Sequence, residues 1–192
     1  MKKTSFIVAF VAATLVSFKT MAPATWDLDG FHSQLRFSVS LLGLSDIEGT
    51  FKIREATINA PKEDFTDASV TMTADVNTID TDVDDRDKHL KSADFFDAEK
   101  YPTITFKSTS FKKESEGRYK VTGELTFHGV TKTVTLDAAG KQAVHPVTNK
   151  TMAGFKVSTV IKRSDFGIAT TTPSTMLSDE VRISANVQFA KK

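Results

Sequence analysis

The feature that most constrains this chain is a two-residue alternation of apolar and polar side chains. Leu35, Phe37, Val39 and Leu41 alternate with arginine and serine residues, and the pattern returns in segments as far along the chain as Phe189. This period places successive side chains on opposite faces of a strand, so one face is buried and the other meets water. About eight such segments, separated by turn residues, predict an all-β antiparallel sandwich or barrel.

One charged segment departs from this alternation. Thr81 is followed by Asp84 at the spacing of a helix N-terminal cap, which predicts a single short helix over residues 84–92. Loops are expected at residues 139–150 and 169–178. No internal repeat or linker divides the chain, so the mature sequence is expected to form one domain.

The N-terminus has the pattern of a secretory signal. A basic start precedes the apolar run of residues 6–18, and small residues follow at Ala22 and Ala24. This pattern predicts a signal peptide over residues 1–24 and a mature chain of residues 25–192. The alternative is an uncleaved anchor, but the apolar run is shorter than the roughly 20 residues that a membrane-spanning helix needs.

Charge and cysteine content exclude several classes of function. Removal of the predicted signal takes away Lys2, Lys3 and Lys19 but no acidic residue, and lowers the formal net charge from +1 to −2. A nearly neutral protein lacks the electrostatic footprint expected for binding nucleic acid or an anionic membrane. The absence of cysteine excludes disulfides, a thiol nucleophile and cysteine-ligated metals.

Motifs for catalysis and metal binding are incomplete. The segment 43–45 begins like a nucleophile elbow, but Ile47 stands where that motif requires glycine. The acidic run of residues 80–87 resembles a calcium loop, yet Asp85 occupies the glycine position and Lys91 that of the bidentate glutamate. The four histidines are far apart in sequence. We therefore expect no catalytic residue, no metal site and no cofactor other than a bound ligand.

The inward-facing residues leave the nature of the interior open. Large residues such as Phe106 and Phe155 share the inward register with small ones such as Ala74, Gly123 and Ala185. A closed eight-stranded barrel either fills its lumen with side chains or holds one small ligand there. The pattern is compatible with both.

Four segments resemble the YceI family. Residues 87–97 (DKHLKSADFFD) and 101–106 (YPTITF) are similar to its central signature. The same holds for residues 123–132 (GELTFHGVTK) and 163–168 (RSDFGI), and these segments follow one another in the family's order. Together with similarities near the start of the mature chain, the resemblance covers almost the whole of it.

The resemblance implies an extended, lipocalin-like, eight-stranded antiparallel barrel with one short helix, located in the bacterial periplasm. The resemblance further implies binding of a polyisoprenoid or another long amphipathic lipid in the lumen, without enzymatic activity. Several members of the family are dimeric. The implied partners are therefore a lipid and a second copy of the chain, with no nucleic acid and no membrane-spanning segment after processing. One departure is Leu41, which precedes Leu42-Gly43 where many members carry histidine, so a polar group near the lumen is absent.

Alternatives to lipid carriage remain at this stage. One is a structural or stress-response interaction module with a packed barrel, and a more distant one is a hydrolase or isomerase that acts on the lipid. If a lipid is carried, Arg86, Lys88 and Lys91 are candidates for contacts with an anionic head group, although helix residues are more commonly solvated. The residues expected to line the lumen are the apolar members of the inward register: Phe37, Val39, Leu41, Phe51, Val70, Met72, Phe106, Leu125, Phe127, Phe155, Val157, Ile161, Ile183 and Val187.

Overall fold

The computed structural model describes residues 22–192, so almost all of the predicted signal peptide, residues 1–24, lies outside the described part. The described residues form strands, one α-helix and two short 3-10 helices. In chain order these are β1 (Ala24–Leu28), η1 (Gly30–His32), β2 (Gln34–Leu41), β3 (Ser45–Ala60), β4 (Ser69–Asp80), α1 (Asp84–Lys91), β5 (Thr103–Ser115), β6 (Arg118–Phe127), β7 (Val130–Val144), β8 (Thr151–Lys162), η2 (Arg163–Phe166) and β9 (Leu177–Lys191).

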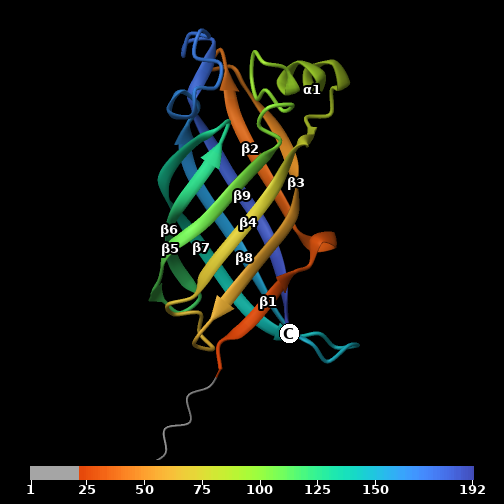
Figure 1. Cartoon of the computed structure of the whole chain (residues 1–192), viewed down its shortest axis with the longest axis vertical. Coiled ribbons are helices and arrows are strands. Elements are labelled where there is room, and N and C mark those ends of the chain that lie inside the picture. Colours follow the sequence, from red (N-terminus) through yellow and green to blue (C-terminus); the bar gives the residue numbers. More distant parts are fainter. Residues whose placement is uncertain (1–21) are drawn as a thin grey trace, which may run out of the picture.

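The strands close into an antiparallel barrel (Figure 1). Both β1 and β2 lie between β3 and β9, one after the other along the barrel, so nine strands fill eight positions. Pairing of β3 with β4 closes the ring. The expected all-β, eight-stranded barrel with one short helix is therefore confirmed. We call the end that carries α1 the upper end, and the end where β1 begins the lower end.

The alternation of the sequence sets the two faces of each strand. Leu35, Phe37 and Val39 of β2 are buried, whereas Arg36 is exposed. Phe37 lies opposite Gly49 of β3, and a Cβ atom at position 49 would stand 2.5 Å from the Phe37 ring. Glycine at this position thus lets an inward aromatic ring cover the neighbouring strand.

The helix forms where it was expected, but its predicted cap is wrong. Val83 occupies the N-cap position and makes no side-chain capping bond. Thr81 is instead buried, and its hydroxyl donates to the Asp87 carboxylate at 2.6 Å. The reason is that the chain takes two further residues to leave β4 before the helix begins, so Thr81 stays inside the end of the barrel.

The predicted loop over residues 139–150 is also wrong in extent. Strand β7 continues to Val144, which pairs with Thr151 of β8, and only the residues between them form the turn. This stretch carries alanine and polar residues without apolar alternation, yet the ladder of backbone hydrogen bonds extends through it. The second predicted loop is present, and ends where β9 begins at Leu177.

An aromatic cluster closes the lower end. Phe65, in the connection between β3 and β4, is 2% exposed, and its ring centroid lies 5.2 Å from that of Trp26 and 5.1 Å from that of Phe155. Tyr119 packs against Phe65 edge to face. These rings fill the lower end of the barrel lumen.

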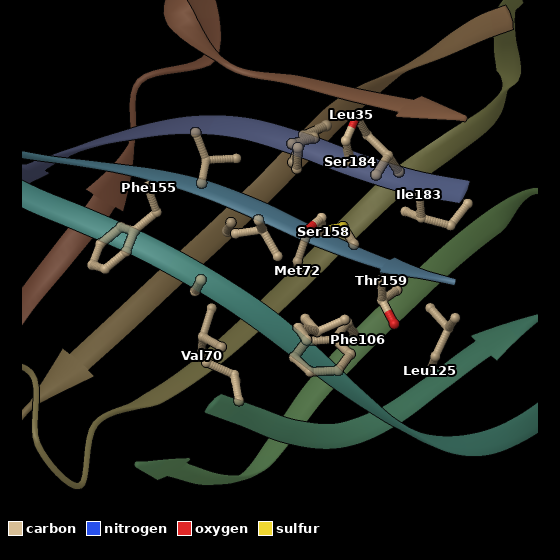
Figure 2. Close-up of a pocket in the computed structure, with 18 of the residues that line it drawn as sticks. Leu35, Val70, Met72, Phe106, Leu125, Phe155, Ser158, Thr159, Ile183 and Ser184 are labelled. Carbon is tan, nitrogen blue, oxygen red and sulfur yellow. The ribbon is translucent and has the colours of Figure 1, made fainter. Parts of the chain in front are cut away.

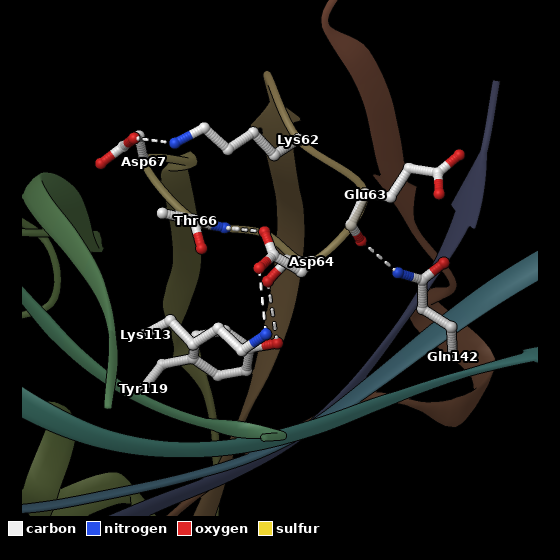
Figure 3. Close-up of polar contacts among 8 residues, drawn as sticks. All are labelled: Lys62, Glu63, Asp64, Thr66, Asp67, Lys113, Tyr119 and Gln142. Atoms are coloured by element: carbon white, nitrogen blue, oxygen red, sulfur yellow. Dashed lines mark hydrogen bonds and ion pairs between the residues drawn. The ribbon is translucent and has the colours of Figure 1, made fainter. Parts of the chain in front are cut away.

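Polar contacts fasten the β3–β4 connection over this cluster (Figure 3). The Tyr119 hydroxyl donates to the backbone carbonyl of Asp64 at 3.1 Å, and the Gln142 amide donates to that of Glu63. The Asp64 carboxylate lies 3.0 Å from the Lys113 ammonium. The hydrogen bond from Lys113, together with those from Thr66, lowers the pKa of Asp64 to about 2.

Candidate ligand-binding cavity

A buried arginine shapes one side of the upper end. Arg163 begins η2 directly after β8 and is only 6% exposed. Its guanidinium has five N–H donors in a rigid plane, which suits several carbonyl acceptors at once. A buried charge without such partners would be strongly destabilising. Here the guanidinium donates to the backbone carbonyls of Ile168, Ala169, Thr172, Leu177 and Ser178, and so fixes the whole connection between η2 and β9.

A carboxylate supports the same connection from outside. Asp179 accepts hydrogen bonds from the backbone N–H and the hydroxyl of Ser164, at 3.0 and 2.8 Å. Burial alone would raise the pKa of Asp179, but these hydrogen bonds and the charges of Arg163 and Lys162 outweigh it and hold the pKa below its ordinary value. The carboxylate therefore stays ionised and bonded over the neutral range.

The upper cavity lies between the η2–β9 connection, the α1 segment and the strands below them. Its volume is about 370 Å³. Aromatic rings of Phe37, Phe51 and Phe127 form much of its wall, and Arg86 and His89 of α1 reach it from one side. This volume is within the range of about 300–1,000 Å³ that is usual for ligand pockets.

The lower cavity continues the lumen toward the aromatic cluster and has a volume of about 130 Å³ (Figure 2). Its walls are mostly apolar and include Val70, Met72 and Phe155. Leu125 and Ile183 line both cavities, which are therefore adjacent along the barrel. Together they give the lumen a mostly apolar interior, and the charged lining residues, Arg86 and Arg163, belong to the upper cavity.

The exposure of inward residues distinguishes hollow from packed parts of the lumen. Val70, Val157 and Ala185 point into the closed barrel and line the lower cavity, yet they are only partly buried, because part of each side chain faces free space. Ala74 is 0% exposed and lines neither cavity. The interior is thus packed around Ala74 and hollow beside Ala185.

The structure brings the fourteen predicted lining residues to these two cavities, while their role in binding stays a prediction. Leu125 and Ile183 lie at the junction. The upper cavity is lined by Phe37, Val39, Leu41, Phe51, Phe127 and Ile161, and the lower one by Val70, Met72, Phe106, Phe155, Val157 and Val187.

The three predicted head-group contacts lie in different environments. Arg86 lines the upper cavity and donates to the hydroxyl and carbonyl oxygens of Thr81, at 2.8 and 2.6 Å. Lys88 is exposed, forms an ion pair with Asp85 at 3.1 Å and is not among the lining residues, and neither is Lys91. Of these candidates the structure therefore places only Arg86 at the cavity.

Three further polar lining residues of the upper cavity, His89, Arg163 and Thr172, escaped prediction. His89 lies beside Arg86 on α1, with Nε2 3.3 Å from the Asp94 carboxylate, and Arg163 lines the opposite side of the cavity. The RSDFGI segment pointed to Arg163 as part of a motif, but gave no indication that its side chain turns inward.

Within residues 22–192, no group of three or more His, Cys, Asp or Glu side chains is placed to hold a metal ion. In the same range, no helix combines the length and apolar character needed to cross a bilayer.

Residues 26–189 match the YceI-like domain. The chain belongs to the YceI family. A UPF0312 relative from Vibrio parahaemolyticus is 34% identical over 184 residues, which cover 95% of this chain and 97% of the relative. The family resemblance in the signature segments is thereby confirmed over the length of the barrel.

Solved structures share the YceI fold. Burkholderia cenocepacia BcnA has a TM-score of 0.73 and 27% identity, covering 84% of this chain and 99% of its own. A domain of Saccharophagus degradans, described as polyisoprenoid-binding and implicated in plant cell wall breakdown, has a TM-score of 0.63 and covers 87% of this chain and 98% of its own. At 15% identity the second similarity shows the common fold alone.

Proposed function

We propose that this YceI-family barrel sequesters or carries a long amphipathic lipid, of the polyisoprenoid or a similar class, in its lumen. The observation that carries the proposal is the pair of adjacent, mostly apolar cavities in the lumen, of which only the upper one is lined by charged side chains. Removal of a long apolar chain from water lowers the free energy in proportion to the area that is buried, and these cavities supply apolar surroundings for it. The polyisoprenoid-binding description of the Saccharophagus degradans domain is consistent with this class of ligand.

The ligand is oriented with its tail toward the lower aromatic cluster and its head group at the upper end. Arg86 and Arg163 supply positive charge on two sides of the upper cavity, and His89 adds a further polar group. Arg163 already donates to backbone carbonyls, so it acts on a head group mainly through its charge. Arg86 has the more accessible guanidinium, and we assign it the direct contact with a polar or anionic head.

The proposal includes location and the absence of catalysis. The N-terminal pattern and the family resemblance support export of the chain to the periplasm after cleavage of residues 1–24. In this proposal the upper cavity holds the ligand and carries out no reaction on it.

Binding of cis-parinaric acid, a long-chain fluorescent fatty acid, tests this proposal on delipidated protein. Ile183→Trp places an indole at the junction of the cavities, whereas Val160→Trp adds the same ring on the exposed face of β8 and is the matched control. The wild type and Val160→Trp should bind the probe saturably, and Ile183→Trp at least tenfold more weakly. Absence of saturable binding to the wild type, or equal affinity of all three proteins, would contradict the proposal.

A further inference from the structure

The tip of the β2–β3 hairpin is apolar and exposed. Leu42 and Gly43 both have positive φ, at 56° and 67°, and the Leu44 N–H donates to the Leu41 carbonyl at 3.0 Å. These features define a β-turn over residues 41–44, inside the three-residue connection between the paired Leu41 and Ser45, and both of its central residues have positive φ. A turn of this kind favours asparagine or aspartate followed by glycine. A leucine in the left-handed region is uncommon, so the requirements of the turn do not account for Leu42. Leu44 is 85% exposed.

This tip is joined to the entrance of the upper cavity. The Leu42 N–H donates to the Met176 carbonyl at 2.8 Å, and Met176 is half exposed while it also lines the cavity. Leu41 and Leu177, the neighbours of these residues in sequence, line the cavity as well. Figure 1 shows β2 ending at the upper end beside the connection that precedes β9. Apolar surface therefore extends from inside the cavity to an exposed edge, the upper rim, formed by Leu42, Leu44 and Met176.

We propose that the upper rim inserts into the surface of a zwitterionic bilayer, so that a lipid tail passes from the bilayer into the cavity without crossing water. This inference rests on the proposed function, since it concerns how the same cavity is loaded. Each methylene of a tail that is exposed to water raises the free energy. Direct apolar contact between the cavity entrance and the hydrocarbon of the bilayer lets the tail avoid this exposure and so lowers the free-energy barrier to its transfer.

Charge selects the kind of bilayer. Residues 80–99, which include α1 at the upper end, hold eight acidic residues and three lysines or arginines. This excess of negative charge repels anionic head groups, whereas it tolerates zwitterionic ones. At the lower end, residues 141–156 hold three lysines and no acidic residue, and they expose Val144 and Val147. That β7–β8 turn is therefore the competing surface, one suited to anionic lipid.

Flotation with phosphatidylcholine vesicles tests the inference. The protein is purified after export and delipidated, and N-terminal sequencing establishes that the apolar run of residues 6–18 is absent. The test variant is Leu42→Asn with Leu44→Ser, and the control is Val144→Ser with Val147→Ser. Asparagine suits the backbone at position 42, so the test variant should fold as well as the wild type, and urea unfolding verifies this.

The wild type and the control should float with phosphatidylcholine vesicles, and the rim variant should partition at least about tenfold more weakly. Tenfold corresponds to about 1.4 kcal/mol, less than the full burial of a single leucine side chain. Replacing part of the phosphatidylcholine by phosphatidylglycerol should weaken flotation at low salt, and added salt should restore it.

Several results would overturn the inference. These are no flotation of the wild type, an equal loss in the control, or stronger flotation on phosphatidylglycerol that depends on Val144 and Val147. A dimer in solution that the rim variant alone abolishes would identify a second copy of the chain as the occupant of the rim. Binding of cis-parinaric acid in the absence of vesicles separates the two proposals. Probe binding without flotation contradicts the inference alone, whereas flotation without probe binding contradicts the carrier function, and with it the loading of the cavity.

Discussion

A leucine substituted at Ala185 should stabilise the ligand-free protein, whereas the same substitution at Ala74 should destabilise it. Both alanines belong to the inward register, but only Ala185 lines the lower cavity, and Ala74 has no exposed surface. Leucine adds three carbon atoms to alanine. In the hollow region these atoms bury previously bare surface, while in the packed region they meet atoms already in contact.

The cavity sets the size of the effect. Burial of three methylene equivalents is worth about 2 kcal/mol at roughly 0.8 kcal/mol each. Ordering of the leucine side chain opposes this by about 0.5–1 kcal/mol. The free energy of unfolding of Ala185→Leu should therefore rise by about 1–2 kcal/mol. This is below the roughly 3 kcal/mol that the complete cavity of about 130 Å³ represents at about 24 cal/mol per Å³. Ala74→Leu should instead lose about 1–3 kcal/mol through overpacking.

Urea unfolding of the delipidated wild type and both variants measures these changes, and extraction of lipid from the undelipidated proteins provides the second readout. Ala185→Leu should retain less lipid than the wild type, since the new side chain occupies ligand space. Equal destabilisation of both variants, with bound lipid unchanged, would refute the division of the lumen into hollow and packed parts.

Three further predictions follow from other parts of the fold. Arg163→Met leaves buried carbonyl groups without their donor, so it should lower the free energy of unfolding by about 3 kcal/mol or more in urea. The pKa of Asp64 is lowered on folding, so the stability that its ion pair with Lys113 contributes is present above about pH 4 and is lost as the pH falls toward about 2. Asp64→Asn should therefore flatten the pH dependence of the urea midpoint in that interval, and an unchanged dependence would contradict this assignment. N-terminal sequencing of exported protein should give Thr25 as the first residue, and a start at Pro23 or Met1 would be inconsistent with the predicted cleavage.

Strand positions were predictable from the sequence because the alternation follows from backbone geometry alone. A residue such as Phe37 or Val157 on an apolar-polar repeat can face only one of two sides, and a closed barrel makes one of them the interior. The alternation does not reveal strand residues that are held by backbone hydrogen bonds without a regular apolar face, or strands too short to show a repeat. The end of β7 near Val144 extends on backbone pairing, and β1 contributes the buried Trp26 from only five residues.

Polar details and free volume were not predictable in this way. Thr81 and Arg163 acquire their roles from contacts with connections that lack any sequence period, so their burial could not be inferred from spacing. Whether the lumen is hollow at Ala185 and packed at Ala74 depends on distances across the barrel, and those are set by side chains from several strands together. The sequence therefore predicted which residues face inward, and the structure located the free space among them.

Mass spectrometry of organic extracts tests the central claim most directly. Wild-type protein and Ile183→Trp are expressed and isolated in parallel and extracted under identical conditions. The wild type should yield, in stoichiometric amount, a molecule with a long alkyl or isoprenyl chain and a polar head, and Ile183→Trp should yield much less of it. The claim that this barrel carries a lipid would be contradicted if the wild type yielded no such molecule, or if both proteins yielded equal amounts.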